Sequence, residues 1–261
     1  MKIALLGYGT VGRGVDEIIS ARVPSLEVAR ILELPDRLTD PRMTASFDDI
    51  LADEQVELVV ECMGGIEPAH TYLMAALESG RHVVTSNKAV VAAHFGELAR
   101  AAAAHGVGLY LEAAVGGGIP WIAGVEKVRR VDEVTSFSGI MNGTTNYIVD
   151  AMRRDGADFA EVLAEAQRLG YAERDPSADV DGLDVLNKTI ISASVAFGVA
   201  CEKNLPTSGI RNLRASDLAL FAAHGRTVKL LGRGVREAQR YAAAGEPGAG
   251  GAGPLRGQPG R

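Results

Sequence analysis

Five carboxylates and one lysine are crowded into a short stretch of this sequence. The residues from Ala172 to Lys188 read AERDPSADVDGLDVLNK, and the acids are Glu173, Asp175, Asp179, Asp181 and Asp184. Three interpretations compete: a metal-binding loop, the solvated start of a helix, and a catalytic group in which the lysine exchanges protons.

The calcium-loop interpretation fails on spacing. An EF-hand loop needs D-x-[DN]-x-[DN]-G and a glutamate at its twelfth position. Aligning on Gly182 puts Asp179 and Asp181 in place, but Ser177 becomes the first ligand and Lys188 the twelfth. A cation in place of the bidentate acid argues against calcium.

The other two interpretations share one geometry. Asp181 could cap a helix that begins at Gly182, and Asp184 and Lys188, four residues apart, could form a surface ion pair. The same spacing puts Asp184 and Lys188 on one helix face, with Glu173 reaching it from the preceding loop. A lysine among carboxylates can exchange a proton with an alcohol or carbonyl oxygen, and the surplus acids can hold a substrate ammonium group.

A second motif lies at the start of the chain. Gly7-Tyr8-Gly9-Thr10-Val11-Gly12 is G-x-G-x-x-G, and it follows an apolar run and opens a helical pattern. In that context it is the dinucleotide-binding fingerprint: the first glycine allows a tight turn, the second a close approach to a pyrophosphate, and the third close helix packing. The helix N-terminus then favours phosphate.

The fingerprint needs an acid about 20 residues further on to bind a ribose hydroxyl. Glu33 occupies that place, and its ordinary alternative is a solvated strand end. Arg37 follows closely and could meet a 2′-phosphate instead. The choice between NAD and NADP stays open.

The rest of the sequence must position these residues. Apolar runs alternate with helical patterns, which predicts a parallel sheet with helices on both faces. Strands are expected at 2–6, 26–34, 56–62, 82–85 and 108–113, and helices at 15–21, 69–79 and 89–105. After about residue 115 the pattern predicts a strand at 133–140, helices at 147–154, 159–169 and 183–197, and a last helix and strand within 216–231.

The predicted class is therefore α/β. A Rossmann-type dinucleotide-binding domain covers residues 1–115, and a second, mixed α+β domain covers 116–235. Residues 236–261 form a Gly/Pro-rich tail that composition predicts to be disordered. The net charge of −6 resembles no basic nucleic-acid footprint, and no apolar run suits a bilayer. Two distant cysteines indicate free thiols in the cytoplasm.

Six segments together resemble one family. They are, in order, GYGTVGRGV, VVTSNKA, EAAVGGGIP, GIMNGTTNYI, LGYAERDP and DVDGLDVLNK, and they resemble homoserine dehydrogenase from Lys2 to about Gly234. The resemblance implies reversible reduction of L-aspartate 4-semialdehyde to L-homoserine with NADPH or NADH. It also implies a homodimer in threonine, methionine and isoleucine biosynthesis, and it makes 116–235 a partial α+β domain for substrate binding and dimerisation.

The resemblance assigns roles to single residues. Lys188 becomes the proton donor and acceptor, Asp184 orients it or the substrate, and Glu173 binds the substrate amino group. Lys88, Gly143 and Thr144 approach the substrate, and Lys88 also nears the nicotinamide. The cofactor set is completed by Gly7, Tyr8, Gly9, Thr10, Val11, Gly12, Glu33, Arg37, Gly64 and Ser86. A monovalent cation, usually sodium, is held at Glu112, Val115, Gly117 and Ile119.

The chain also departs from the family pattern, and other functions compete with the one that the resemblance implies. The family's catalytic domain normally continues past residue 261, so a shortened chain is expected. A dinucleotide-binding pseudoenzyme without turnover is the alternative, and a thiol-dependent semialdehyde dehydrogenase using Cys62 or Cys201 is a third hypothesis. None of the five histidines falls in a motif, so none is assigned a role.

Overall fold

The computed structural model describes residues 1–201, 204–237 and 240–251 of the chain. They form two compact units, and neither is one continuous segment. Residues 1–133 and 194–203 make the first unit, and residues 134–193 with those from 204 onward make the second. The expected boundary at residue 115 therefore falls inside the first unit, which also includes α6 (Trp121–Arg129).

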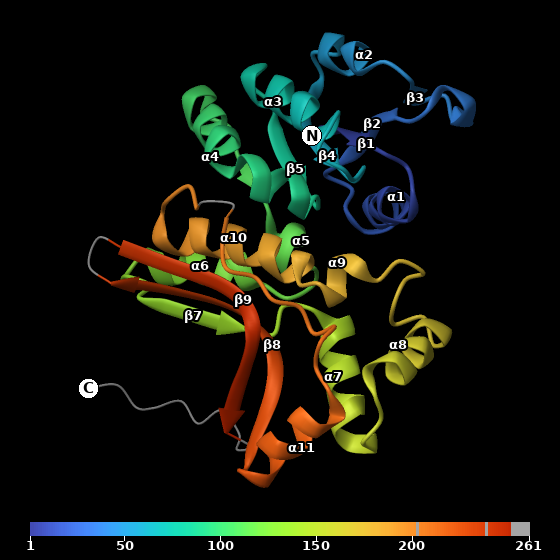
Figure 1. Cartoon of the computed structure of the whole chain (residues 1–261). Coiled ribbons are helices and arrows are strands. Elements are labelled where there is room, and N and C mark those ends of the chain that lie inside the picture. Colours follow the sequence, from blue (N-terminus) through green and yellow to red (C-terminus); the bar gives the residue numbers. More distant parts are fainter. Residues whose placement is uncertain (202–203, 238–239, 252–261) are drawn as a thin grey trace. The chain divides into compact units, whose positions relative to one another are not determined.

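The first unit is built on a parallel six-stranded sheet in the order β3-β2-β1-β4-β5-β6 (Figure 1). This order, with the first strand central, is that of a dinucleotide-binding fold. The strands are β1 (Lys2–Leu6), β2 (Glu27–Leu32), β3 (Met43–Thr44), β4 (Val56–Glu61), β5 (His82–Thr85) and β6 (Leu109–Tyr110).

Helices follow the strands in the first unit. They are α1 (Thr10–Arg22), α2 (Phe47–Ala52), α3 (Ala69–Glu78), α4 (Lys88–His105), α5 (Glu112–Val115) and α6, with a 3₁₀ turn η1 (Pro35–Arg37). Helix α1 was expected to begin near residue 15, but it begins at Thr10 because Gly12 lets its first turn pack directly on the strand end.

Alternating residues of β1 pack into two hydrophobic cores, one on each face of the sheet. Ala4 and Leu6 pack in one cluster with Leu73 of α3 and Leu98 of α4. Ile3 and Leu5 belong to the opposite cluster, which includes Ile19 of α1. A strand buried on both faces needs continuous apolar residues, which is why KIALL reads as a short apolar run.

The second unit joins a small antiparallel sheet to a set of helices. Its sheet has the order β7-β8-β9, from β7 (Ser136–Gly139), β8 (Arg226–Glu237) and β9 (Arg240–Gly251). Its helices are α7 (Gly143–Asp155), α8 (Phe159–Arg168), α9 (Ser177–Val180), α10 (Leu183–Phe197) and α11 (Ala215–Ala223). The last residues of α10 belong to the first unit.

The tail differs from its prediction. Disorder was expected for 236–261, yet Arg240–Gly251 is a strand paired with β8 along its whole length. Gly245 adds two hydrogen bonds, donating to the carbonyl of Pro206 and accepting from the amide of Ser208. A glycine-rich strand is held by its backbone ladder, which a composition argument based on side-chain burial does not count. Residues 238–239 and 252–261 lie outside the described residues.

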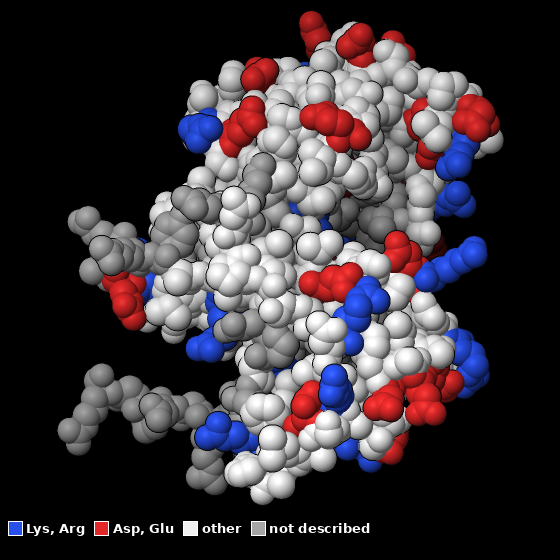
Figure 2. Space-filling model, viewed as in Figure 1, with Lys and Arg blue, Asp and Glu red and all other residues white. Residues whose placement is uncertain are grey.

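The surface carries charges of both signs. On the face shown in Figure 2, acidic and basic side chains are interspersed. Within the described ranges, every helix is too short or too polar to cross a bilayer.

Candidate functional site

The glycine loop joins β1 to α1 in the first unit, and each of its glycines meets a different constraint. Gly7 has a φ of 91°, which a residue with a side chain rarely adopts. A Cβ on Gly12 would lie 2.1 Å from the carbonyl oxygen of Gly7, so only glycine fits. A Cβ on Gly9 would meet nothing within 4 Å, so the space beside its backbone is open to a ligand.

Glu33 follows β2 and is fixed by backbone amides. Its Oε2 accepts from the amide of Tyr8 at 3.0 Å, and its Oε1 accepts from the amide of Leu34 at 2.9 Å. The carboxylate therefore lies directly against the glycine loop. Each oxygen keeps a lone pair for a further donor, such as a ribose hydroxyl.

A cavity of about 360 Å³ lies beside these residues. Gly7, Tyr8, Gly9, Glu33 and Arg37 all line it, together with Pro68 and Tyr72 at the start of α3. A wider hollow of about 940 Å³ is lined by charged residues at the amino ends of β1 and β2. Because ligands of open parallel sheets bind at the carboxyl ends of the strands, the smaller cavity is the candidate site.

An ion-pair network holds Tyr8 in place. The Tyr8 hydroxyl donates to Asp16 at 2.6 Å, and Arg42 donates to Asp16 and to Asp40. Hydrogen bonds from Arg42 keep the pKa of Asp16 below its usual value, and the bond to Asp16 raises the pKa of Tyr8. The loop residue that lines the cavity is thus anchored to α1.

A buried carboxylate organises the neighbouring strand ends. Glu61, at the end of β4, is fully buried and accepts from the amide of Met63 at 2.8 Å and from the side chains of Thr85 and Asn87. The Asn87 amide nitrogen also donates to the carbonyl of Gly65 at 2.7 Å. The network ties the loop after β4 to the loop after β5.

The sequence analysis missed Glu61 and Asn87. The only available signal was an acid at the end of an otherwise apolar strand, ELVVEC, which is costly to bury without partners.

Three expected cofactor or substrate residues adjoin this network. Gly64, with a φ of 115°, donates its amide to Glu61 at 3.3 Å. Ser86 donates its amide to the carbonyl of Glu61 at 3.2 Å, and Lys88 is the half-buried first residue of α4. The structure thus brings Gly64, Ser86 and Lys88 together at the carboxyl ends of β4 and β5. Thr10 and Val11 lie in the first turn of α1.

The expected cation segment is a tight turn. Both carboxylate oxygens of Glu112 accept from the first turn of α6, from the amide of Ile122 at 2.9 Å and of Ala123 at 2.7 Å. A Cβ on Gly116 would lie 2.1 Å from the carbonyl oxygen of Ile119 and 3.4 Å from Oε1 of Glu112. Oxygens of Glu112 and Ile119 therefore converge at Gly116, while Val115 ends α5 and Gly117 has a φ of 58°.

The second unit carries the lysine and its acid. Nζ of Lys188 is 2.9 Å from Oδ2 of Asp184 and donates to the carbonyl of Met141 at 2.8 Å. Asp184 is 4% exposed and the Lys188 side chain 18% exposed, so the pair is largely removed from water. The Asn142 amide nitrogen donates to Oδ2 of Asp184 at 2.9 Å. This ammonium is held in one position, unlike that of an exposed i,i+4 pair.

Asn142 joins the NGTTN segment to the acids. Its Nδ2 donates to Asp179 at 2.7 Å as well as to Asp184, and its Oδ1 caps α7 by accepting from the amide of Thr145 at 2.8 Å. Sequence analysis assigned no role to Asn142 or Asp179. The pattern of an asparagine at a helix N-cap was readable, but its contact with acids some forty residues away was not.

The other expected substrate residues surround this helix start. Gly143 is the first residue of α7, and a Cβ there would meet nothing within 4 Å. Thr144 donates its hydroxyl to the carbonyl of Tyr171 at 2.9 Å. Glu173 is exposed, and its backbone carbonyl accepts from Gln167 at 3.0 Å. The structure joins Asp184 to Lys188 and leaves the Glu173 side chain in solvent.

The remaining acids of the stretch have separate tasks. Asp175 accepts from the amide of Ser177 at the start of α9. Asp181 was expected to cap the helix bearing Lys188, but it ends α9 and pairs with Arg211 at 2.7 and 2.9 Å. Gly182, with a φ of 86°, separates the two helices, so Asp181 cannot serve as the N-cap residue of α10.

The cysteines lack the character of a nucleophile. Neither Cys62 nor Cys201 forms a disulfide, and Cys201 is buried. Burial and, to a lesser extent, the neighbouring Glu61 carboxylate together raise the pKa of Cys62 to about 11. A thiol with a raised pKa carries little thiolate at neutral pH, which counts against the thiol-dependent hypothesis.

Comparisons with known proteins agree with this geometry. A family model described as homoserine dehydrogenase, NAD binding domain, matches residues 7–112, and one described as homoserine dehydrogenase matches residues 120–246. The homoserine dehydrogenase of Synechocystis sp. is 45% identical over 250 residues, covering 88% of this chain and 56% of that protein. That of Corynebacterium glutamicum is 42% identical over 243 residues, covering 88% and 55%.

Solved structures show the same likeness. A homoserine dehydrogenase from Thiobacillus denitrificans superposes with a TM-score of 0.88 at 35% identity, covering 95% of this chain and 61% of that one. A putative homoserine dehydrogenase from Archaeoglobus fulgidus gives a TM-score of 0.85 at 28% identity, covering 98% and 86%. The chain spans a little over half the length of the curated relatives it matches.

Proposed function

Because the chain belongs to the homoserine dehydrogenase family, we propose that it catalyses the reversible reduction of L-aspartate 4-semialdehyde to L-homoserine with a nicotinamide dinucleotide. The observation that carries this proposal is the position of the Lys188 ammonium, held between Asp184 and the carbonyl of Met141. The place of the activity is amino-acid biosynthesis leading to threonine, methionine and isoleucine.

The chemistry needs one hydride and one proton. When bound, the dinucleotide supplies the hydride to the aldehyde carbon. Lys188 donates the proton to the carbonyl oxygen as negative charge develops there, and it takes the proton back in the reverse direction. Asp184 is the positioning residue, because it keeps the ammonium in one rotamer and stabilises its charge in a largely dry environment.

Substrate recognition is proposed to use groups around the start of α7. The first-turn amides of α7, at Gly143 and Thr144, suit an anionic or carbonyl oxygen. Glu173, which is exposed, would hold the substrate ammonium group, which requires its side chain to leave solvent. Lys88 supplies a further cation at the carboxyl end of β5.

The proposed cofactor residues fit a dinucleotide. Gly7, Tyr8, Gly9, Thr10, Val11 and Gly12 supply the phosphate loop, and Gly64 and Ser86 border the nicotinamide side. Glu33 favours NAD, since its carboxylate accepts ribose hydroxyls and repels a 2′-phosphate. Arg37 lines the same cavity and favours NADP. We propose that the fixed position of Glu33 makes NAD the better ligand.

The turn from Glu112 to Ile119 is compatible with the monovalent cation of the family. A hard cation needs oxygen donors, and the Glu112 carboxylate and the Ile119 carbonyl converge at Gly116. Backbone carbonyls of Val115 and Gly117 would complete the donor set. The ion would rigidify a turn that begins at the sheet edge and ends at α6.

A cytoplasmic homodimer is proposed as the working form. Two free cysteines suit a reducing compartment. Light scattering on the purified chain measures the assembly directly.

The test is the absorbance of the reduced nicotinamide cofactor, with purified protein and L-homoserine. Wild type is compared with Lys188→Met and with Lys127→Met, a control that removes an exposed lysine of α6. We expect turnover that Lys188→Met lowers by about 10²–10⁴-fold and Lys127→Met leaves unchanged.

Other outcomes discriminate between the hypotheses. A folded chain that binds the dinucleotide without homoserine-dependent turnover is the pseudoenzyme. Activity that survives alkylation of the thiols would eliminate the thiol-dependent reaction.

A further inference from the structure

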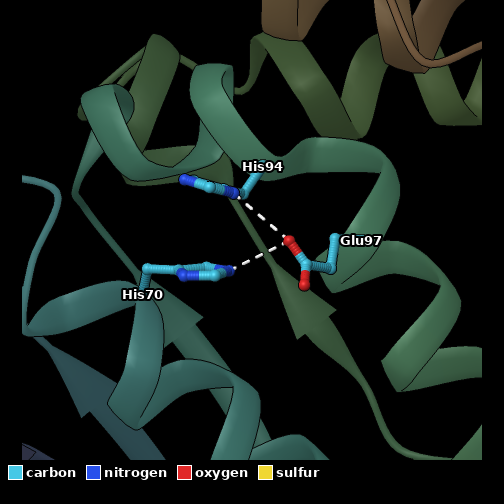
Figure 3. A group of neighbouring side chains, drawn as sticks. All are labelled: His70, His94 and Glu97. Atoms are coloured by element: carbon cyan, nitrogen blue, oxygen red, sulfur yellow. Dashed lines mark hydrogen bonds and ion pairs between the residues drawn. The ribbon is translucent and has the colours of Figure 1, made fainter.

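A cluster of two histidines and a glutamate lies on helices α3 and α4 of the first unit. His70 comes from α3, and His94 and Glu97 come from α4 (Figure 3). One ligand atom from each side chain lies within 4.8 Å of the others. Oε2 of Glu97 is 3.1 Å from Nε2 of His70 and 3.2 Å from Nδ1 of His94. None of the three lines the cavity beside the glycine loop.

We propose that His70, His94 and Glu97 bind a divalent transition-metal ion of the zinc class. Two imidazoles and a carboxylate are a donor set that zinc prefers, with bonds of about 2.0–2.1 Å. In a tetrahedral site, two ligands at that distance stand about 3.3 Å apart. The measured separations of 3.1 and 3.2 Å from Glu97 are close to this value.

The contacts of His70 are compatible with an ion at this place. Oε1 of Glu67 is 3.1 Å from Nδ1 of His70, so both ring nitrogens face carboxylates. A neutral imidazole has one N–H, which can satisfy only one of these contacts. With Nδ1–H donated to Glu67, Nε2 presents its lone pair, which is the arrangement of a metal-ligating histidine with its supporting carboxylate.

The two rings are stacked in the structure. The centroids of His70 and His94 are 3.7 Å apart with an interplanar angle of 19°. A bound divalent ion would be shared by one nitrogen of each ring and by Glu97. Because the lone pairs of parallel rings do not converge, binding turns the His94 ring out of the stack.

The surroundings allow the His94 ring to move and keep the carboxylate that supports His70 in place. His94 has non-helical backbone angles, φ −133° and ψ 19°, at a kink in α4. Its side chain is 26% exposed and that of Glu97 is 46% exposed, which leaves room for a water as fourth ligand. Glu67 accepts from the Thr71 hydroxyl at 2.8 Å, so the supporting carboxylate is itself oriented. The ion would fasten α3 to α4.

The experiment is calorimetric titration of Zn²⁺ into the metal-free chain, with the visible spectrum of Co²⁺ as a second readout. We expect one ion per chain, a higher melting temperature with Zn²⁺, and at least about tenfold weaker binding in His70→Gln, His94→Gln and Glu97→Gln. Glu67→Gln should weaken binding by about tenfold. Neither readout depends on the proposed dehydrogenase activity.

His224→Gln is the matched control, because His224 is an exposed histidine whose Nδ1 lies 2.9 Å from the carbonyl of Leu220. It should bind Zn²⁺ as wild type does. Should either histidine variant fail to fold, Glu97→Gln decides, since it keeps the side-chain shape. No zinc binding by wild type, or equal affinity in the folded variants, overturns the site.

Discussion

Lys188 and Asp184 lie one turn apart on α10, and 2.9 Å separates the ammonium nitrogen of one from the carboxylate oxygen of the other. The carboxylate is 4% exposed and also receives the amide of Asn142. The pair is therefore a fixed arrangement of charge, and each partner depends on the other to be buried.

Asp184→Asn tests that dependence. The change removes the negative charge and leaves a buried ammonium beside a carbonyl and an amide, without its counter-ion. We expect a lower kcat with dinucleotide affinity unchanged, and a changed pH–rate profile. A kcat and profile equal to those of wild type would show that Asp184 does not position the lysine.

Asn142→Asp tests the junction at the start of α7. The aspartate keeps an oxygen for capping Thr145 but places a third carboxylate against Asp179 and Asp184. At pH 7 we expect Asn142→Asp to lose more stability than Asn142→Ala, which costs about 1 kcal/mol as a lost cap. Urea unfolding at pH 7 measures the difference in stability between the two variants.

Three glycines of one segment form a matched series. Gly12→Ala drives a Cβ into the carbonyl of Gly7 and should unfold or strongly destabilise the first unit. Gly9→Ala meets open space, so it should keep the melting temperature and lose dinucleotide binding. Gly14→Ala, inside α1 with open space, should raise stability by about 0.4–1 kcal/mol. If Gly9→Ala and wild type bound the dinucleotide with equal affinity, the dinucleotide would not bind at this loop.

Glu33→Gln tests cofactor choice. The glutamine amide still accepts hydrogen bonds but carries no charge. It therefore binds the ribose hydroxyls of NAD more weakly and repels the 2′-phosphate of NADP less. We expect NADH affinity to fall about tenfold or more, from the loss of a charge-assisted hydrogen bond worth about 1.5–3 kcal/mol, and NADPH affinity to rise. Fluorescence titration measures both, and Arg37→Gln should change them in the opposite direction.

Acid stability should depend on Asp16. Its pKa in the folded chain is lowered, first by hydrogen bonds from Arg42. A carboxylate with a lowered pKa contributes stability above its unfolded pKa of about 3.9, and that contribution is lost as pH falls through the folded value. Asp16→Asn should therefore be less stable than wild type at pH 7, with a smaller decline toward pH 3. If the urea midpoints of Asp16→Asn and wild type changed equally between pH 7 and pH 3, Asp16 would not be the source of the acid sensitivity.

The central strands and the long helices could be predicted because their signals are local. The apolar run at 2–6 and the glycines after it define β1 and its turn, and α10 spans 183–197 as its pattern indicates. Short elements such as α2 and β3 were not predicted, since they contain too few residues to show a periodic pattern. The strand β9 was not predicted because backbone pairing cannot be read from amino-acid composition.

The candidate site divides in the same way. Gly12 and Glu33 are readable because their motif spacing has a physical cause. Glu61, Asn142 and Asp179 were missed because their contacts join residues distant in sequence. His70 and His94 were left without a role for that reason as well: only the packing of α3 against α4 brings their rings together.

The interleaved order of the two units has a consequence for synthesis on the ribosome. The first unit includes Ser194, whose hydroxyl accepts the amide of Cys201, so it is not complete until about residue 203 has been made. By then residues 134–193 have already emerged from the exit tunnel or are passing through it. The first unit therefore cannot finish folding before the second unit has been largely synthesised, as it could if each unit were one continuous segment. Until then, the surface that packs against Ser194–Cys201 stays exposed in the nascent chain.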